Sequence, residues 1–142
     1  MRDSVPRPGA FGPGRLADVN IVLWIVAALL ALAFAFAGLS KLTQPRQALI
    51  DRGMTYVEDL PQPLVKVIGT LEVLGAIGLV APAWTGVAPV LTPIAAAGFM
   101  ALMVGAMITH LRRGEPKMIA ANAILFLLAA FIAWGRFGPY AF

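Results

Sequence analysis

Four long apolar segments, each able to cross a lipid bilayer as a helix, constrain this chain more than any other feature. They cover about residues 19–41, 64–81, 93–111 and 118–135 of its 142 residues. At about 1.5 Å of rise per residue, helices of this length suit a hydrocarbon core about 30 Å thick. Charged residues make up only 13% of the chain, whereas about a quarter is usual in soluble domains. The sequence therefore predicts an all-α polytopic membrane protein, a four-transmembrane-helix bundle.

The composition divides the chain into three parts. Residues 1–18 combine prolines and glycines with three arginines and lack a continuous apolar core, so we expect a disordered tail rather than a signal peptide. Residues 19–136 are expected to form one four-helix membrane domain. Residues 137–142 form a short aromatic C-terminal tail, a composition that suits the membrane interface.

Helix boundaries inside the membrane domain are predicted from capping residues and prolines. Asp18 is expected to cap the first helix and Thr92 the third. Pro82 is expected to end the second span, because proline breaks a continuing helix. Between Pro45 and Gly53 the pattern is amphipathic, which predicts a short interfacial helix after the first span.

Small residues recur at three- and four-residue intervals in the first three spans. Such stripes allow helix backbones to approach closely, and in lipid this packing drives helix association. Because glycine and alanine are common in membrane spans, the same spacing also arises by chance. The small residues expected at helix contacts are Gly38, Gly69, Gly75 and Gly105, with Ala97 and Ala101 on the stripe of Gly105.

One carboxylate, Glu72, lies inside an otherwise apolar span. A charge at mid-membrane depth costs about 2.5–3.5 kcal/mol on insertion scales, so Glu72 should face protein or water and have a partner. Lys41, His110 and Asn122 lie toward the same membrane side on the other three spans. We therefore predict one polar ligand-binding pocket formed by these four residues, and we assign no catalytic residue.

Each residue of this pocket also has a purely structural interpretation. Lys41 could reach the headgroups by extending along the helix. His110 could be an ordinary interfacial residue, and Asn122 could hydrogen-bond another helix. Glu72 could be protonated, or paired with Lys41 or His110 for stability alone.

The residue content excludes several classes of chemistry. The chain has no cysteine and one histidine, so it has no disulfide, thiol relay or bis-histidine haem, and we expect no metal site. The formal net charge of +4 suits lipid headgroups and topology, and we expect no nucleic-acid partner. By the positive-inside rule, the connections after the first and third spans should be cytoplasmic and both termini external.

Three segments resemble the DoxX-like family of small four-helix membrane proteins. They are Ala37–Leu42 at the end of the first span, Ile68–Ala76 in the second and Gly105–Leu111 in the third. The resemblance runs from about Leu23 to Arg136 and leaves out the N-terminal tail. The positions that match the family are Gly38, Lys41, Gly69, Glu72, Gly75 and His110.

The resemblance implies a role in redox complexes. The family's namesake is similar to a small subunit of a thiosulfate:quinone oxidoreductase, and other members are described as membrane partners in oxidative-stress or thiol-handling complexes. We therefore expect a non-catalytic subunit or scaffold in the bacterial inner membrane, beside a redox protein or within a larger complex. Its pocket would bind a small ligand, such as a quinone, with no covalently bound cofactor. Self-association into a homo-oligomer is left open.

Within this hypothesis each polar residue has a role. Glu72 would accept a hydrogen bond or proton from the ligand or fix Lys41, His110 would control protonation near neutral pH, and Asn122 would donate to a carbonyl. Two alternatives remain. One is a small proton-coupled transporter that uses Glu72, although Lys41 would repel a cation. The other is a membrane enzyme that acts on a lipid-like substrate by proton transfer.

Overall fold

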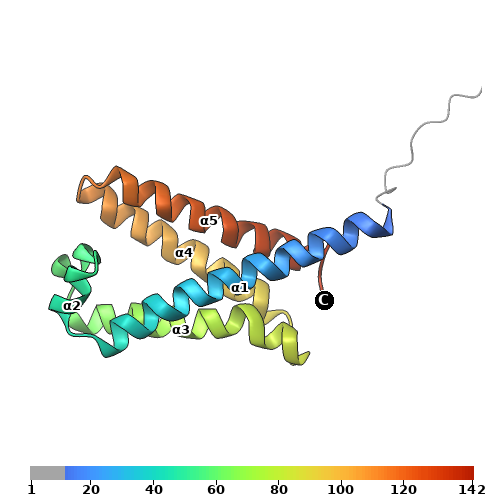
Figure 1. Cartoon of the computed structure of the whole chain (residues 1–142), viewed down its shortest axis with the longest axis horizontal. Helices are drawn as coiled ribbons and strands as arrows, with labels where there is room; N and C mark the ends of the chain where they lie inside the picture. The colour runs from blue at the N-terminus through green and yellow to red at the C-terminus, as the bar shows by residue number, and fades with distance from the viewer. Residues whose placement is uncertain (1–11) are drawn as a thin grey trace, which may run out of the picture.

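The computed structural model describes residues 12–142, so the part of the expected tail at residues 1–11 lies outside the described residues. The described chain is helical apart from its connections and its last residues (Figure 1). In chain order the elements are α1 (Pro13–Thr43), α2 (Arg46–Asp51), the 3-10 helix η1 (Thr55–Asp59), α3 (Gln62–Thr85), α4 (Leu91–Arg112) and α5 (Pro116–Phe137).

Four of these helices, α1, α3, α4 and α5, are long and apolar enough to cross a membrane. Large apolar side chains on their outer faces are exposed, for example Leu32 and Phe36 at 70% and 67%. Lipid is the solvent that suits such faces. The predicted fold class, a four-helix membrane bundle with a short helix after the first span, is confirmed.

The bundle consists of two closely packed helix pairs. α1 packs mainly on α3, and α4 packs mainly on α5. α3 also contacts α4, whereas α1 and α5 touch less. Figure 1 shows that the two pairs diverge toward the end of the bundle that carries α2. The segment of α2 and η1 lies at this open end, as do Lys41 at the end of α1 and His110 at the end of α4.

Three predicted helix boundaries are wrong. α1 begins at Pro13, so residues 13–18 of the expected tail are helical, and Asp18 lies inside the helix instead of capping it. α3 continues through Pro82 to Thr85. A proline so near the end of a helix removes only one internal hydrogen bond, and exposing more backbone to lipid would cost more. The helix stops at Gly86, whose φ of 72° is the left-handed conformation of a C-cap.

The third boundary concerns the start of α4. Helix α4 begins at Leu91, so Thr92 is a residue of the first turn and not the cap. Its side chain is buried, and Thr92 Oγ1 has no hydrogen-bond partner among the described residues. The turn before it is already closed by backbone hydrogen bonds from Leu91 and Thr92 to Ala88 and Pro89. A side-chain cap is therefore not needed there.

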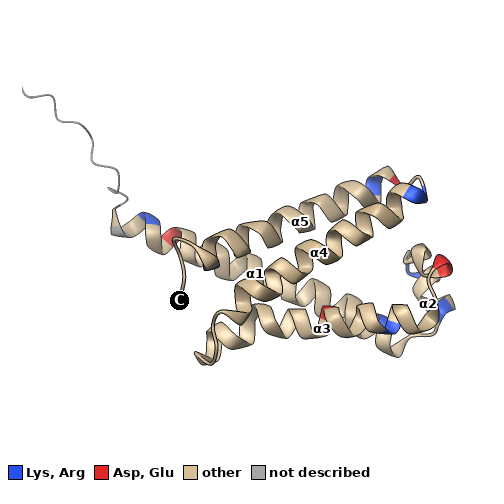
Figure 2. Ribbon diagram, turned by 180° about the vertical axis from the view of Figure 1, so that it is seen from behind, with Lys and Arg blue, Asp and Glu red and all other residues tan. Residues whose placement is uncertain are grey.

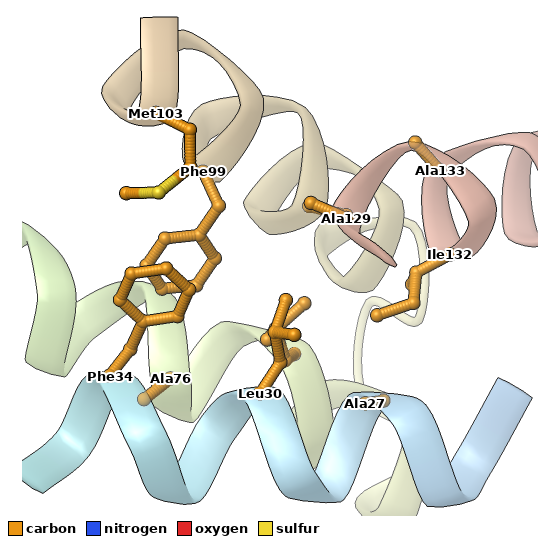
Figure 3. Packing of buried hydrophobic residues seen from close by; sticks show 11 residues of the cluster. Ala27, Leu30, Phe34, Ala76, Phe99, Met103, Ala129, Ile132 and Ala133 are labelled. Carbon is orange, nitrogen blue, oxygen red and sulfur yellow. The ribbon is translucent and has the colours of Figure 1, made fainter. Parts of the chain in front are cut away.

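The apolar core lies in the middle of the bundle, where both helix pairs meet. Figure 3 shows Phe34 of α1 beside Phe99 of α4, and their ring centres are 3.9 Å apart in a stacked arrangement. Gly75 of α3 leaves room for this pair, because a Cβ there would lie 2.5 Å from Phe99 Cζ. Towards the open end, Phe34 also forms part of the wall of a cavity.

Candidate functional site

The intramembrane carboxylate forms an ion pair with the lysine at the end of the first span. Lys41 Nζ on α1 donates to both carboxylate oxygens of Glu72 on α3, at 3.0 Å to Oε1 and 2.8 Å to Oε2. Their side chains are only 3% and 6% exposed. Lys41 is thus turned into the bundle, not toward the headgroups. The pair neutralises a charge that would otherwise be costly at this depth.

Two glycines make room for this ion pair. A Cβ at Gly38 would lie 2.7 Å from Gly69 O and 3.0 Å from Glu72 Cβ. Reciprocally, a Cβ at Gly69 would lie 2.9 Å from both Gly38 O and Lys41 Cβ. The backbones of α1 and α3 therefore meet at these glycines, and each charged residue packs over the glycine of the opposite helix. Any larger residue there would push the two charges apart.

A second lysine caps the C-terminal end of α1. Lys66 Nζ on α3 donates to the backbone oxygens of Lys41 and Leu42, each at 2.8 Å. These carbonyls belong to the last turn of α1, where a cation is favourable. Lys66 therefore fixes the backbone that carries Lys41. Helical spacing relates no residue of α3 to the end of α1, so the sequence alone did not indicate this role for Lys66.

His110 is oriented by a glutamate that follows α4. His110 Nδ1 lies 2.6 Å from Glu115 Oε2, and Arg113 Nε donates to Glu115 Oε1 at 3.0 Å. The hydrogen bonds from His110 and Arg113 lower the pKa of the Glu115 carboxyl, so it is ionised. A carboxylate can only accept, so Nδ1 carries the proton. In neutral His110 the other ring nitrogen, Nε2, is then an acceptor.

Tyr56 of η1 connects the histidine with the ion pair. Its ring meets that of His110 edge-on, with centres 5.5 Å apart, and Lys41 Nζ lies 5.8 Å from its centre. Burial raises the pKa of the Tyr56 hydroxyl, although Lys41 acts in the opposite direction. The hydroxyl is therefore neutral and able to donate. Sequence reasoning missed Tyr56 because its position depends on how the segment after α2 folds back over the bundle.

Asn122 of α5 is buried and bonds within its own helix. Its Nδ2 donates to Met118 O at 2.9 Å, so the interhelical hydrogen bond considered from the sequence is not formed among the described residues. One amide hydrogen and the side-chain oxygen remain for another partner.

All four predicted pocket residues line a single cavity of about 390 Å³. Its wall is mostly apolar, and all four long helices and the segment before α3 contribute to it. Exposed Leu64 and Met118 are part of the wall, so the cavity reaches the surface of the bundle. Gly105, expected at a helix contact, instead lines this cavity, and a Cβ there would meet nothing within 4 Å. Ala97 and Ala101, on the same stripe, face outward.

Hydrogen bonds hold the segment of α2 and η1 across the open end of the bundle. Arg113 donates to Asp59 of η1 as well as to Glu115, which links the segment to the α4–α5 connection. Arg46 Nη2 donates to Leu60 O at 2.8 Å. Figure 2 shows charged residues of both signs at this end of the bundle. The polar network around His110 thus also determines where Tyr56 lies.

These features define the class of the protein. It is a polytopic integral membrane protein in which Lys41, Glu72, His110 and Asn122 converge on one cavity. Within residues 12–142 no group of acidic, histidine or cysteine side chains is placed to hold a metal ion. The chain belongs to the DoxX-like family, whose pattern matches residues 25–132. No curated protein and no solved structure is significantly similar to it.

Proposed function

We propose that the cavity binds the headgroup of a quinone or quinol and that the protein is a non-catalytic membrane subunit that holds this ligand beside a redox partner. One observation carries the proposal. Hydrogen-bonding groups from three separate elements, Tyr56, His110 and Asn122, converge on one cavity with otherwise apolar walls. Such a lining is typical of sites that bury an apolar ligand and orient it through a few polar contacts.

The chemistry of these groups suits both redox forms of such a ligand. The Tyr56 hydroxyl and the remaining Asn122 amide hydrogen can donate to quinone carbonyl oxygens. Neutral His110 can accept a hydrogen bond from a quinol hydroxyl through Nε2, and ionised Glu115 stabilises the imidazolium if the proton is transferred. The two electrons and the second quinol proton would pass to the partner protein. The Lys41–Glu72 pair would fix the wall beside these groups.

The cavity's position is consistent with a lipid-soluble ligand. It lies at one end of the spans and reaches the surface near Leu64 and Met118. A quinone with an apolar tail could therefore enter from the membrane without crossing water. We place this activity in the inner membrane of a bacterium, where quinones and their redox partners meet.

Direct binding tests the ligand assignment. Purified protein in mild detergent is titrated with a short-chain benzoquinone, and dissociation constants are compared for wild type, Tyr56→Phe and His110→Gln. Each variant should bind about tenfold more weakly, the effect of losing one hydrogen bond in a buried site. Tyr140→Phe, the same change at the other end of the bundle, is the matched control. Equal affinity for all four proteins would reject the quinone site.

A second experiment tests the role as a subunit. The protein is purified from its native membrane in mild detergent, and bound proteins and quinones are identified by mass spectrometry. The proposal expects a redox protein or quinone with the wild type that is lost with Glu72→Gln, although this variant still inserts. A ligand-free and partner-free preparation of the wild type would contradict the proposal.

One observation favours an enzyme as the second candidate. Proton transfer needs two groups within reach of one substrate, and the rings of Tyr56 and His110 are 5.5 Å apart in the same cavity. Product formation from a lipid extract that depends on both residues would establish this alternative. A proton-coupled cation transporter is less well supported, since Lys41 already neutralises Glu72 at 2.8 Å.

A further inference from the structure

A second buried charge lies at the opposite end of the bundle and has no part in the cavity described above. Arg136, in the last turn of α5, is only 5% exposed. Among residues 12–142 no carboxylate forms an ion pair with it. A buried guanidinium without a counter-charge is unfavourable, so an anion from outside the described chain would stabilise it.

The contacts of Arg136 orient its side chain without neutralising it. Nη1 donates to Asn20 Oδ1 at 2.6 Å and to Tyr140 O at 2.9 Å. The guanidinium carbon lies 4.1 Å from the centre of the Phe142 ring and 5.6 Å from that of Trp24. All four contacting groups, two oxygens of amides and two aromatic rings, are neutral. Nε and Nη2 form no hydrogen bond with any described residue, so one edge of the guanidinium keeps its donors for another ligand.

This guanidinium borders a cavity of about 380 Å³. The cavity lies between the end of the α3–α4 connection, at Pro89 and Val90, and the C-terminal segment, at Ala141 and Phe142. Apart from Arg136, these lining side chains are apolar. The site therefore combines one buried positive charge with walls that suit hydrocarbon.

We propose that Arg136 binds the phosphate group of a lipid with a net negative headgroup. The free edge of a guanidinium matches two oxygens of a phosphate. Arg136 is the penultimate residue of a membrane span, which places it at the depth of the headgroups. The apolar walls would contact the glycerol and upper acyl chain. Free inorganic phosphate offers the same oxygens but cannot use these walls.

Native mass spectrometry of the full chain in detergent tests this proposal. Wild-type protein is titrated with phosphatidylglycerol and with phosphatidylcholine, and we expect about tenfold tighter binding of phosphatidylglycerol, because the choline cation of phosphatidylcholine offsets the charge of its phosphate. Arg136→Gln should remove this preference, whereas Arg136→Lys should retain part of it. Arg112→Gln removes an exposed charge at the other end of the bundle and should leave the preference unchanged.

The source of the phosphate is decided by competition. Millimolar inorganic phosphate that displaces phosphatidylglycerol from the wild type would assign the same site to a free anion, and no displacement would assign it to lipid. Equal binding of the two lipids by wild type would overturn the proposal, and this comparison needs no variant to fold. An Arg136→Gln protein that keeps the wild-type preference would overturn it as well.

Discussion

At the scale of single residues, the Lys41–Glu72 pair buries two charges, and each charge compensates the other by direct contact. Each side chain alone would be a buried charge in an apolar bundle, whereas together they form two hydrogen bonds of 3.0 and 2.8 Å. Removing one partner of such a pair leaves the other uncompensated. Replacing both by apolar residues removes the charge altogether.

We therefore predict strong coupling between these two residues. Lys41→Met and Glu72→Gln should each lower the free energy of unfolding in mixed micelles by about 3–5 kcal/mol. The double variant Lys41→Met with Glu72→Leu should lose much less than the sum of the two single changes. Glu58→Gln, at an exposed position of η1, should change the unfolding free energy by less than about 0.5 kcal/mol. Additive single effects would show that the pair is not a coupled unit in solution.

Glu115 makes the stability of the fold depend on pH. Its pKa is lowered in the folded protein by hydrogen bonds from His110 and Arg113. A carboxyl with a lowered folded pKa stabilises the fold above its ordinary pKa, and this contribution is lost as the pH falls through the folded value. The difference in Tm between wild type and Glu115→Gln should thus be present at neutral pH and shrink below about pH 4.5. A difference that is constant down to strongly acidic pH would contradict this assignment.

At the scale of elements, the contact between α1 and α3 depends on two glycines. Gly38→Ala would place a Cβ 2.7 Å from a backbone oxygen of α3, which cannot move like the end of a side chain. Overpacking of this kind typically costs about 1–3 kcal/mol. We expect Gly38→Ala and Gly69→Ala each to lower the unfolding free energy by this amount.

Gly105→Ala provides the matched control for this helix contact. It makes the same change in α4, where the added Cβ would meet nothing within 4 Å. We expect a neutral or slightly stabilising effect, since alanine favours a helix over glycine. Equal losses of unfolding free energy for Gly105→Ala and Gly38→Ala would show that the loss does not come from close packing between α1 and α3.

For the whole molecule, much of the fold and part of the candidate site could be predicted from the sequence. Span length and apolarity give four helices, and helical spacing places Lys41 one turn beyond Gly38 and Glu72 one turn beyond Gly69. Both are spacings of three residues on one helix, so helical geometry predicts them directly from the sequence. The convergence of Lys41, Glu72, His110 and Asn122 on one cavity followed from their common membrane side.

The rest of the fold and of the site depends on contacts between residues far apart in the sequence, which helical spacing does not predict. Periodicity shows which residues share a helix face, but in lipid both faces are apolar, so it does not show which face is buried. Ala97 and Ala101 were for this reason expected at a helix contact, whereas both are exposed. Tyr56 and Arg136 are positioned by segments that fold back on the bundle from its two ends. No spacing rule relates such residues to their partners.

Membrane orientation is the last property of the whole molecule that the structure helps to predict. The α1–α3 and α4–α5 connections lie at the same end of the bundle (Figure 2), and short loops rich in Lys and Arg stay in the cytoplasm. Lys41 and Lys66 are engaged inside the bundle, but the basic residues left at this end still predict a cytoplasmic location. They are Arg46, Arg52, Arg112, Arg113 and Lys117.

Because the chain has no cysteine, single introduced thiols can report this orientation without background. Gln47→Cys places a thiol at an exposed position of α2, and Val87→Cys places one in the α3–α4 connection, where Val87 is 70% exposed. In intact bacterial cells a membrane-impermeant maleimide should label Val87→Cys and spare Gln47→Cys, while both react after permeabilisation. The reverse pattern would put the mouth of the cavity and the residues around His110 outside the cytoplasm. Any redox partner would then have to meet the cavity from that side.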